Sequence, residues 1–76
     1  MSVARYFVFE PDGEWLVSLG GAVLTRHSSQ EAAERSAIVM ADLMGSMHHD
    51  ADVMVEAEGG LDIVWAYGRD PVPEAA

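Results

Sequence analysis

The fold of this chain is decided by residues 28–47, which read SSQEAAERSAIVMADLMGSM. Ser28 and Glu31 have the spacing of a capping box, in which each side chain satisfies a backbone N–H of the other residue at a helix N-terminus. Glu31 also stands four residues before Arg35, the spacing at which opposite charges attract on a helix surface. The stretch therefore predicts one long amphipathic helix that begins at Ser28.

The predicted helix has two distinct faces. Charged residues occupy the outer face, where Ile38 is the one apolar exception. Gly45 leaves two endings open: a left-handed cap there would end the helix at Met44, whereas an interior glycine costs only about 1 kcal/mol. We favour continuation to Met47, because that residue returns to the apolar face. The predicted apolar face consists of Ala33, Ser36, Ala37, Met40, Leu43, Met44 and Met47.

The segments on both sides of the helix have the composition of β-strands, with aromatic and β-branched residues in alternating patterns. Pro11-Asp12-Gly13 and Glu58-Gly59-Gly60 have the chemistry of tight turns. Gly20-Gly21 fits a two-residue hairpin turn. The predicted strands are residues 3–10, 14–19, 52–57 and 61–67, and residues 22–25 are a candidate fifth strand.

The order of these elements, β-β-(β)-α-β-β, predicts an α+β fold. In this fold an antiparallel sheet of four strands, or five with residues 22–25, carries the long helix on one face. A chain of 76 residues forms one small domain, residues 1–76, and we expect an ordered core over about residues 3–73 and a frayed tail at residues 74–76. Strand alternation predicts a core that rests on Trp15. The predicted core members are Tyr6, Val8, Trp15, Val17, Leu19, Met40, Leu43 and Met44.

The charge balance excludes some classes of partner. Four basic and 13 acidic residues give a formal net charge of −9. This charge repels phosphate backbones, so no nucleic-acid partner is expected. The chain has no cysteine, which removes disulfides and thiolate metal sites, and it has no apolar run of the length that a membrane span requires. We expect a cytoplasmic protein of bacterial type with no membrane partner and no cofactor.

The densest group of metal-ligand residue types follows the helix directly, at His48, His49, Asp50 and Asp52. Imidazole and carboxylate ligands suit zinc and other divalent ions. Adjacent helical residues, however, point about 100° apart, and no His-Glu-x-x-His spacing is present. We therefore expect a solvated helix end rather than a metal site. A small-ligand or divalent-metal-binding domain that uses residues 48–52 is the alternative function.

No residue pattern of an enzyme is present. The chain lacks cysteine and lysine, and it has no Gly-x-Ser-x-Gly sequence and no glycine-rich phosphate loop. Glu10, Asp12 and Glu14 crowd one hairpin, where two of them could serve as acid and base. Carboxylates at an exposed turn are usually only solvated, so we expect no catalytic residues and no enzyme.

The C-terminal segment Tyr67-Gly68-Arg69-Asp70-Pro71-Val72-Pro73 has a motif of its own. Pro71 favours an extended Asp70, whose carboxylate can accept nearby backbone N–H groups. The Tyr67 ring can pack while its hydroxyl reaches a polar partner. The motif predicts either a fastening of the tail to the fold, which we favour, or a dock for a ligand or partner. Its members are Tyr67, Gly68, Asp70, Pro71 and Pro73.

This segment resembles the Tyr-Gly-x-Asp-Pro-x-Pro ending of a bacterial family of small β-β-α-β-β proteins, catalogued as domain of unknown function 2188. The resemblance spans nearly the whole chain, from about Tyr6 to Pro73, and it implies the fold but no activity. The other landmarks that carry it are Gly13, Trp15, Val17, Ser28, Glu31, Ala32, Val53, Val55 and Gly60.

Strand alternation leaves five large apolar residues on the side of the sheet away from the helix. A single helix covers only one face, so these residues would form an exposed patch of the kind that marks an interface. We predict a homodimer, formed through this sheet face or through sheet edges, with Ile38 as a weaker second contact. The expected function is that of a small non-enzymatic module acting by protein–protein contact, first with itself. The predicted interface residues are Phe7, Phe9, Leu16, Met54 and Val64.

Overall fold

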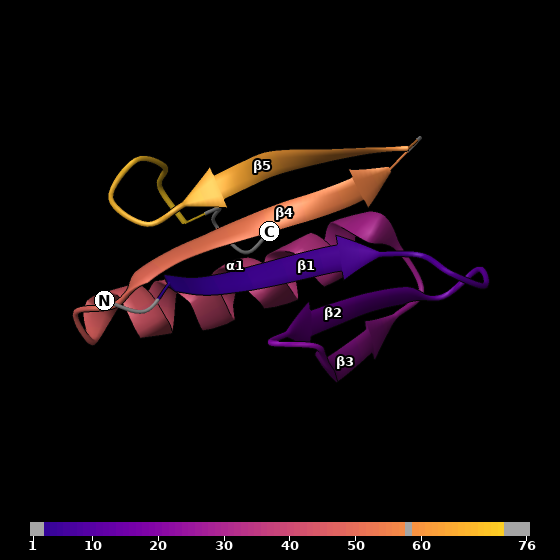
Figure 1. The fold of residues 1–76 in the computed structure, drawn as a ribbon, viewed down its shortest axis with the longest axis horizontal. Coiled ribbons are helices and arrows are strands. Elements are labelled where there is room, and N and C mark those ends of the chain that lie inside the picture. Colours follow the sequence, from indigo (N-terminus) through magenta and orange to yellow (C-terminus); the bar gives the residue numbers. More distant parts are fainter. Residues whose placement is uncertain (1–2, 58, 73–76) are drawn as a thin grey trace.

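The computed structural model describes residues 3–57 and 59–72, in which five strands and one helix follow the order β-β-β-α-β-β (Figure 1). This order confirms the α+β prediction, including the third strand. Glu58, Pro73 and residues 74–76 lie outside the described residues, so the predictions for them have no structural outcome. The elements are β1 (Val3–Phe9), β2 (Trp15–Leu19), β3 (Ala22–His27), α1 (Gln30–Ser46), β4 (Asp50–Ala57) and β5 (Gly60–Ala66).

The strands form one mixed sheet in the order β3-β2-β1-β4-β5. β1 pairs with β4 in parallel, with Val8 opposite Val55, whereas the other neighbouring strands are antiparallel. The expectation of a fully antiparallel sheet is corrected at this central pair. The cause is the third strand: after three strands, the helix carries the chain back to the end of the sheet at which β1 begins, so β4 repeats the direction of β1.

The turn between β2 and β3 depends on its two glycines. Gly20 and Gly21 have φ angles of 60° and 86°, and Leu19 pairs directly with Ala22 across them. Two successive positive φ angles define the primed two-residue turn that matches the twist of a hairpin. This turn makes β3 a strand of the sheet.

The N-terminus of α1 lies one residue later than the sequence predicts. Ser29 is the N-cap, with extended backbone at φ −141°, and its Oγ accepts a hydrogen bond from the N–H of Ala32 at 3.2 Å. The predicted capping box of Ser28 and Glu31 is therefore wrong in register. Two consecutive serines both satisfy the side-chain requirement for a cap, and the sequence alone does not choose between them.

The C-terminus of α1 follows the continuation that the sequence favours. The helix runs to Ser46, and the next residue, Met47, is its C-cap. The N–H of His48 donates to the carbonyl of Gly45 at 3.1 Å, and the N–H of His49 donates to the carbonyl of Met44 at 3.3 Å. This is the Schellman arrangement. Its left-handed position belongs to His48, with φ 68°, and Gly45 lies inside the helix.

α1 packs on the sheet through its smallest residues. Ala33, Ala37, Ala41 and Gly45 recur every fourth position and are all buried, together with Ile38. Residues four apart lie on one side of a helix, and side chains this small let the helix backbone approach the sheet closely. The face of α1 that packs on the sheet is therefore rotated relative to the predicted apolar face. Ile38, expected on the outer surface, is 6% exposed, whereas Leu43 and Met47, expected in the core, are 60% and 50% exposed.

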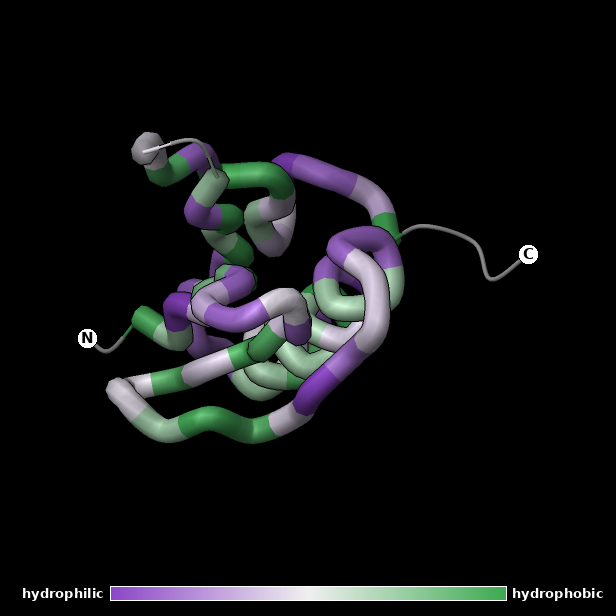
Figure 2. Tube along the Cα trace, turned by 90° about the vertical axis from the view of Figure 1, so that its right-hand side faces the viewer, coloured by the Kyte–Doolittle hydropathy of each residue, from purple (hydrophilic) through white to green (hydrophobic). Residues whose placement is uncertain are grey.

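The core lies between α1 and the sheet face that we call the closed face. Figure 2 looks along the strands and shows the helix on this one side of the sheet. Burial raises the pKa of the Tyr6 phenol. Trp65 is 2% exposed and is the deepest aromatic residue, whereas Trp15 is half-buried at the margin, so the core does not rest on Trp15 as expected. The closed face consists of Ala4, Tyr6, Val8, Val17, Ala51, Val53, Val55 and Trp65.

Candidate interaction surface

The opposite sheet face, which we call the open face, carries a row of side chains that crosses all five strands. Phe7 pairs with Ser18 on β2 and with Met54 on β4. Ser18 in turn pairs with Val23 on β3, and Met54 pairs with Ile63 on β5. Directly paired residues point to the same side of a sheet. Four of the five members of this row are therefore large and apolar.

A second row lies beside the first, towards the ends of β1 and β4. Phe9 pairs with Leu16, and Leu16 pairs with Arg26 at the β3 edge. Phe9 and Glu56 each lie one residue beyond the Val8–Val55 pair, so they are neighbours across the sheet. Glu56 in turn pairs with Leu61 on β5. This row is apolar in its centre and at the β5 edge, and it carries one charge of each sign.

Four of the five predicted interface residues meet on the open face as the alternation predicts: Phe7, Phe9, Leu16 and Met54. Val64, the fifth, is the extra residue of a bulge in the pairing of β4 with β5, and this bulge sets Ile63 opposite Met54. The sequence reasoning also missed Val23 and Leu61. Their signal was the same two-residue periodicity, continued into the edge strands.

The described residues leave the open face without a covering layer. Ser18, in the middle of the sheet, is 9% exposed because larger neighbours surround it, but the apolar residues at the edges are not shielded. Val23 is 46% exposed, Ile63 44% and Leu61 50%. In Figure 1 the strands lie in front of the helix, so the viewer faces the open side of the sheet.

Two ion pairs flank the apolar rows of the open face, one near the start of β1 and β4 and one at the β3 edge. The Asp52 carboxylate accepts two hydrogen bonds from the Arg5 guanidinium, at 3.0 and 3.1 Å. This hydrogen bonding, and then the charge of Asp52, raises the pKa of Arg5. At the β3 edge, Arg26 lies 3.4 Å from Glu14, and both side chains are more than half exposed. A pair this long and exposed contributes little, so Arg26 is available to a second carboxylate.

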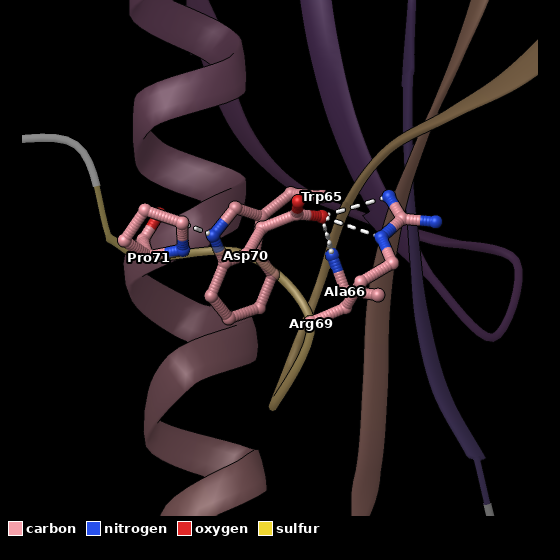
Figure 3. Close-up of polar contacts among 5 residues, drawn as sticks. All are labelled: Trp65, Ala66, Arg69, Asp70 and Pro71. Carbon is pink, nitrogen blue, oxygen red and sulfur yellow. Dashed lines mark hydrogen bonds and ion pairs between the residues drawn. The ribbon is translucent and has the colours of Figure 1, made fainter.

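The tail after β5 is fastened to the closed side of the molecule, as Figure 3 shows. The indole N–H of Trp65 donates to the carbonyl of Pro71 at 2.9 Å. The Asp70 carboxylate accepts from the N–H of Ala66 at 3.0 Å and from Nε of Arg69 at 2.8 Å. The hydrogen bond from Arg69, assisted by that from Ala66, lowers the pKa of Asp70. These contacts lie away from the open face.

Tyr67 contacts the helix and explains the interior glycine. A Cβ built on Gly45 would overlap the Tyr67 ring, so only glycine lets this ring lie against the helix backbone. The ring also meets Trp65 edge to face, with centroids 6.4 Å apart. Gly68 then takes a left-handed conformation, with φ 83°, and turns the chain. In the described part of the tail motif, Tyr67, Asp70 and Pro71 thus have structural contacts, and Gly68 provides the turn.

The four candidate metal ligands are not brought to one point. His48 is the left-handed residue of the helix cap, Asp50 is exposed at the start of β4, and both oxygen atoms of Asp52 are bonded to Arg5. Within residues 3–57 and 59–72, no group of three or more histidine or acidic residues has the geometry to hold a metal ion.

Of the acidic hairpin residues, Glu10 lines a cleft of about 450 Å³ at the carboxyl ends of β1 and β4. Glu10 and Glu56 line this cleft together with Phe9 and Trp15, while Glu14 is drawn to Arg26. Phe9 and Glu56 also belong to the open face. The cleft therefore adjoins the open face at the end that carries the Glu10 and Glu56 carboxylates, and Trp15 and Gln30 line it from the helix side.

The chain matches no protein-family model, and no curated protein or solved structure matches it at a significant level. The resemblance of the tail to domain of unknown function 2188 thus stays a prediction. In the part of the chain that the structure describes, no helix has both the length and the apolar character to cross a membrane.

Proposed function

We propose that this protein is a small non-enzymatic module that acts by protein–protein contact, first with a second copy of itself. The observation that supports this proposal is the open face, where large apolar residues cross all five strands. A sheet face that meets only water normally carries polar residues at these positions. Contiguous exposed apolar surface is typical of interaction sites.

We expect the open face to be large enough to hold a dimer. Burying about 500 Å² of apolar surface from each copy contributes about 25 kcal/mol before costs, at about 25 cal/mol per Å². Lost translational and rotational freedom and side-chain ordering offset most of that amount. The remaining cost is repulsion between two chains of net charge −9, which salt screens. We therefore expect a micromolar two-fold dimer that tightens as salt is added.

The experiment is sedimentation equilibrium at micromolar concentration. Wild type should have twice the 8.2 kDa mass of the chain, and the variant Phe7→Asp with Phe9→Ser should be a folded monomer. The matched control is Val39→Asp with Leu43→Ser, which makes the same kinds of change at exposed positions of the helix surface and should leave the dimer intact. A monomeric wild type, or a control that dissociates while the open-face variant does not, would overturn the proposal.

The alternative function, binding of a small ligand or divalent metal by residues 48–52, has no comparable support. Asp52 is occupied by Arg5, and His48 is held in the helix cap. A ligand that binds the native state must raise the melting temperature. We expect zinc or manganese chloride to leave the melting temperature unchanged, and a rise that His48→Ala abolishes would favour the alternative instead.

A further inference from the structure

We infer that the cleft at the carboxyl ends of β1 and β4 is a binding site for a linear aliphatic diamine. Glu10 and Glu56 provide the carboxylates for its two ammonium groups, and Phe9 and Trp15 provide apolar walls for its methylene chain. This inference goes beyond the proposed function and does not depend on self-association, because the cleft is formed within one chain.

The first step concerns how the fold forms the cleft. Because β1 and β4 are parallel neighbours, their carboxyl ends meet at one end of the sheet, and α1 begins at this same end (Figure 1). Phe9 is the last residue of β1, and Trp15 is the first residue of β2. The cleft has a volume of about 450 Å³, which is typical of small-molecule sites. Its walls therefore come from strand ends and a helix start that the fold holds together.

The second step concerns charge. The chain has four arginines and no lysine, and each arginine has a nitrogen 2.7–3.4 Å from a carboxylate outside the cleft. Within residues 3–57 and 59–72, Glu10 and Glu56 have no hydrogen bond or ion pair through their side chains. The cleft therefore contains two carboxylates with no counter-charge from these residues. The four arginine pairs are Arg5–Asp52, Arg26–Glu14, Arg35–Glu31 and Arg69–Asp70.

The start of α1 adds a weaker field of the opposite sign. A helix N-terminus carries about half a positive charge, and here Ser29 caps it and Glu31 stands in its first turn. Two full carboxylates outweigh this charge, so the cleft attracts cations and repels anions such as phosphate. The amide nitrogen of Gln30, which lines the cleft, donates to Glu34 at 2.8 Å. This leaves the Gln30 amide oxygen as a further acceptor for an ammonium group.

The lining favours an organic cation over a metal ion. A divalent metal ion needs several oxygen ligands at one point, and in the described part of the chain no group of three or more histidine or acidic residues provides them. Aromatic rings attract ammonium groups and bury methylene groups. Phe9 and Trp15 are half-buried, so part of each ring remains exposed. A dication with an alkyl chain matches two carboxylates and two rings, and a linear diamine is the simplest such ligand.

The experiment is a titration of ¹⁵N-labelled protein with 1,5-diaminopentane at neutral pH and fixed ionic strength, followed by NMR. The indole cross-peak of Trp15 should move, whereas that of Trp65, whose N–H is bonded to the Pro71 carbonyl, should stay. Pentylamine has one ammonium group fewer and should bind about fivefold more weakly, the upper end for an exposed ion pair. Pentane-1,5-diol, which has the chain without charge, should not bind. Magnesium chloride that moves the same cross-peaks at the same concentration would overturn the inference, because the cleft would then attract any dication.

Substitutions in the cleft test each role. Glu10→Gln and Glu56→Gln keep the size of the side chain and remove its charge, and each should weaken diamine binding about threefold to fivefold. Asp42→Asn on the helix is the matched control, and it should leave the Kd unchanged. Trp15→Leu should weaken binding more than Trp15→Phe, which keeps an aromatic ring, and circular dichroism melts establish that each variant is folded. Wild-type affinity in both glutamine variants, or an equal loss in Asp42→Asn, would overturn the inference.

Discussion

The two faces of the sheet are built from alternate residues of the same strands, and they differ in both side-chain size and exposure. On the closed face, Val8, Val17 and Val53 are fully buried against alanines and a glycine of the helix. On the open face, Phe7 and Phe9 flank Val8 along the same strand and are only half-buried. Around Val8 the larger apolar side chains therefore face away from the helix, whereas the closed face holds its largest residues, Tyr6 and Trp65, elsewhere along its strands.

This difference separates two roles. The closed face determines whether the chain folds, because its residues are sealed from water by the helix and the tail. Under the proposed function, the open face determines whether the folded chain associates, because a second copy supplies the layer that covers its apolar area. Substitutions on the closed face should therefore change the free energy of unfolding and leave the dimer Kd of the folded protein unchanged, and substitutions on the open face should do the reverse.

The largest effect should come from Trp65→Ala. Truncation of a fully buried aromatic residue costs about 3–5 kcal/mol, and this change also leaves the Pro71 carbonyl without its indole donor. Urea denaturation measures the loss. Trp15→Ala should cost clearly less, because Trp15 is only half-buried. Equal losses for the two variants would contradict the account of the closed face.

The second effect concerns the contact between tail and helix. Gly45→Ala should destabilise the protein by about 1–3 kcal/mol, the usual cost of overpacking, because the new methyl group overlaps the Tyr67 ring. In a Tyr67→Ala background the same change should instead stabilise by up to about 1 kcal/mol, since alanine is the better helix former. Chemical denaturation of the four variants tests this reversal of sign, and a loss of the same size in both backgrounds would show that the ring is not the obstacle.

The parallel pairing of β1 with β4 was not predicted from the sequence. The periodicity predicted the helix, the strands and the residues of each face, because alternation depends only on local geometry. It did not predict which strands are parallel neighbours. β1 and β4 run parallel because residues 22–27 form a third strand before the helix, and the sequence signal for that strand was the Gly20-Gly21 turn. With two strands before the helix, the same chain would have given an antiparallel pair.

Three other differences have local causes. Ser28 and Ser29 are chemically equivalent caps, so a shift of one residue was invisible in the sequence. The helix face was assigned by hydrophobicity, which favours Leu43 and Met47, whereas close packing selected alanines. A bulge in the pairing of β4 with β5 makes Val64 the extra residue and sets Ile63, instead of Val64, opposite Met54. The tail motif was predicted from the sequence, but the hydrogen bond from the Trp65 indole to the Pro71 carbonyl was not.

A smaller effect is expected at the helix C-terminus. His48→Gly should stabilise the protein by about 1 kcal/mol, because a left-handed conformation carries a steric cost in residues that have a Cβ, and His48 has φ 68°. Ser46→Gly, two residues earlier in the regular helix, should destabilise it instead. Thermal melts of both variants at one protein concentration give the comparison, and a loss of stability in His48→Gly would count against the cap described above.

The smallest effect should appear only in acid. The folded pKa of Asp70 lies below its ordinary value of 3.8, chiefly because of the hydrogen bond from Arg69. Its contribution to stability is therefore complete above that value and is lost as the pH falls through the lower folded pKa. Melting temperatures from pH 7 down to about pH 2 should decline less steeply for Asp70→Asn than for wild type. Equal declines in the melting temperatures of the two proteins would show that the Asp70 carboxylate does not help to fasten the tail.

The most direct test of the central claim, that a second copy covers the open face, is an isotope-filtered nuclear Overhauser experiment. The sample mixes ¹³C-labelled and unlabelled chains at a concentration well above the dimer Kd. We expect intermolecular cross-peaks from the methyl groups of Met54, Ile63 and Val23 to open-face protons of the other chain, and none from Val39 or Leu43 on the helix. Cross-peaks confined to the helix residues, or no intermolecular cross-peaks at all, would contradict the account.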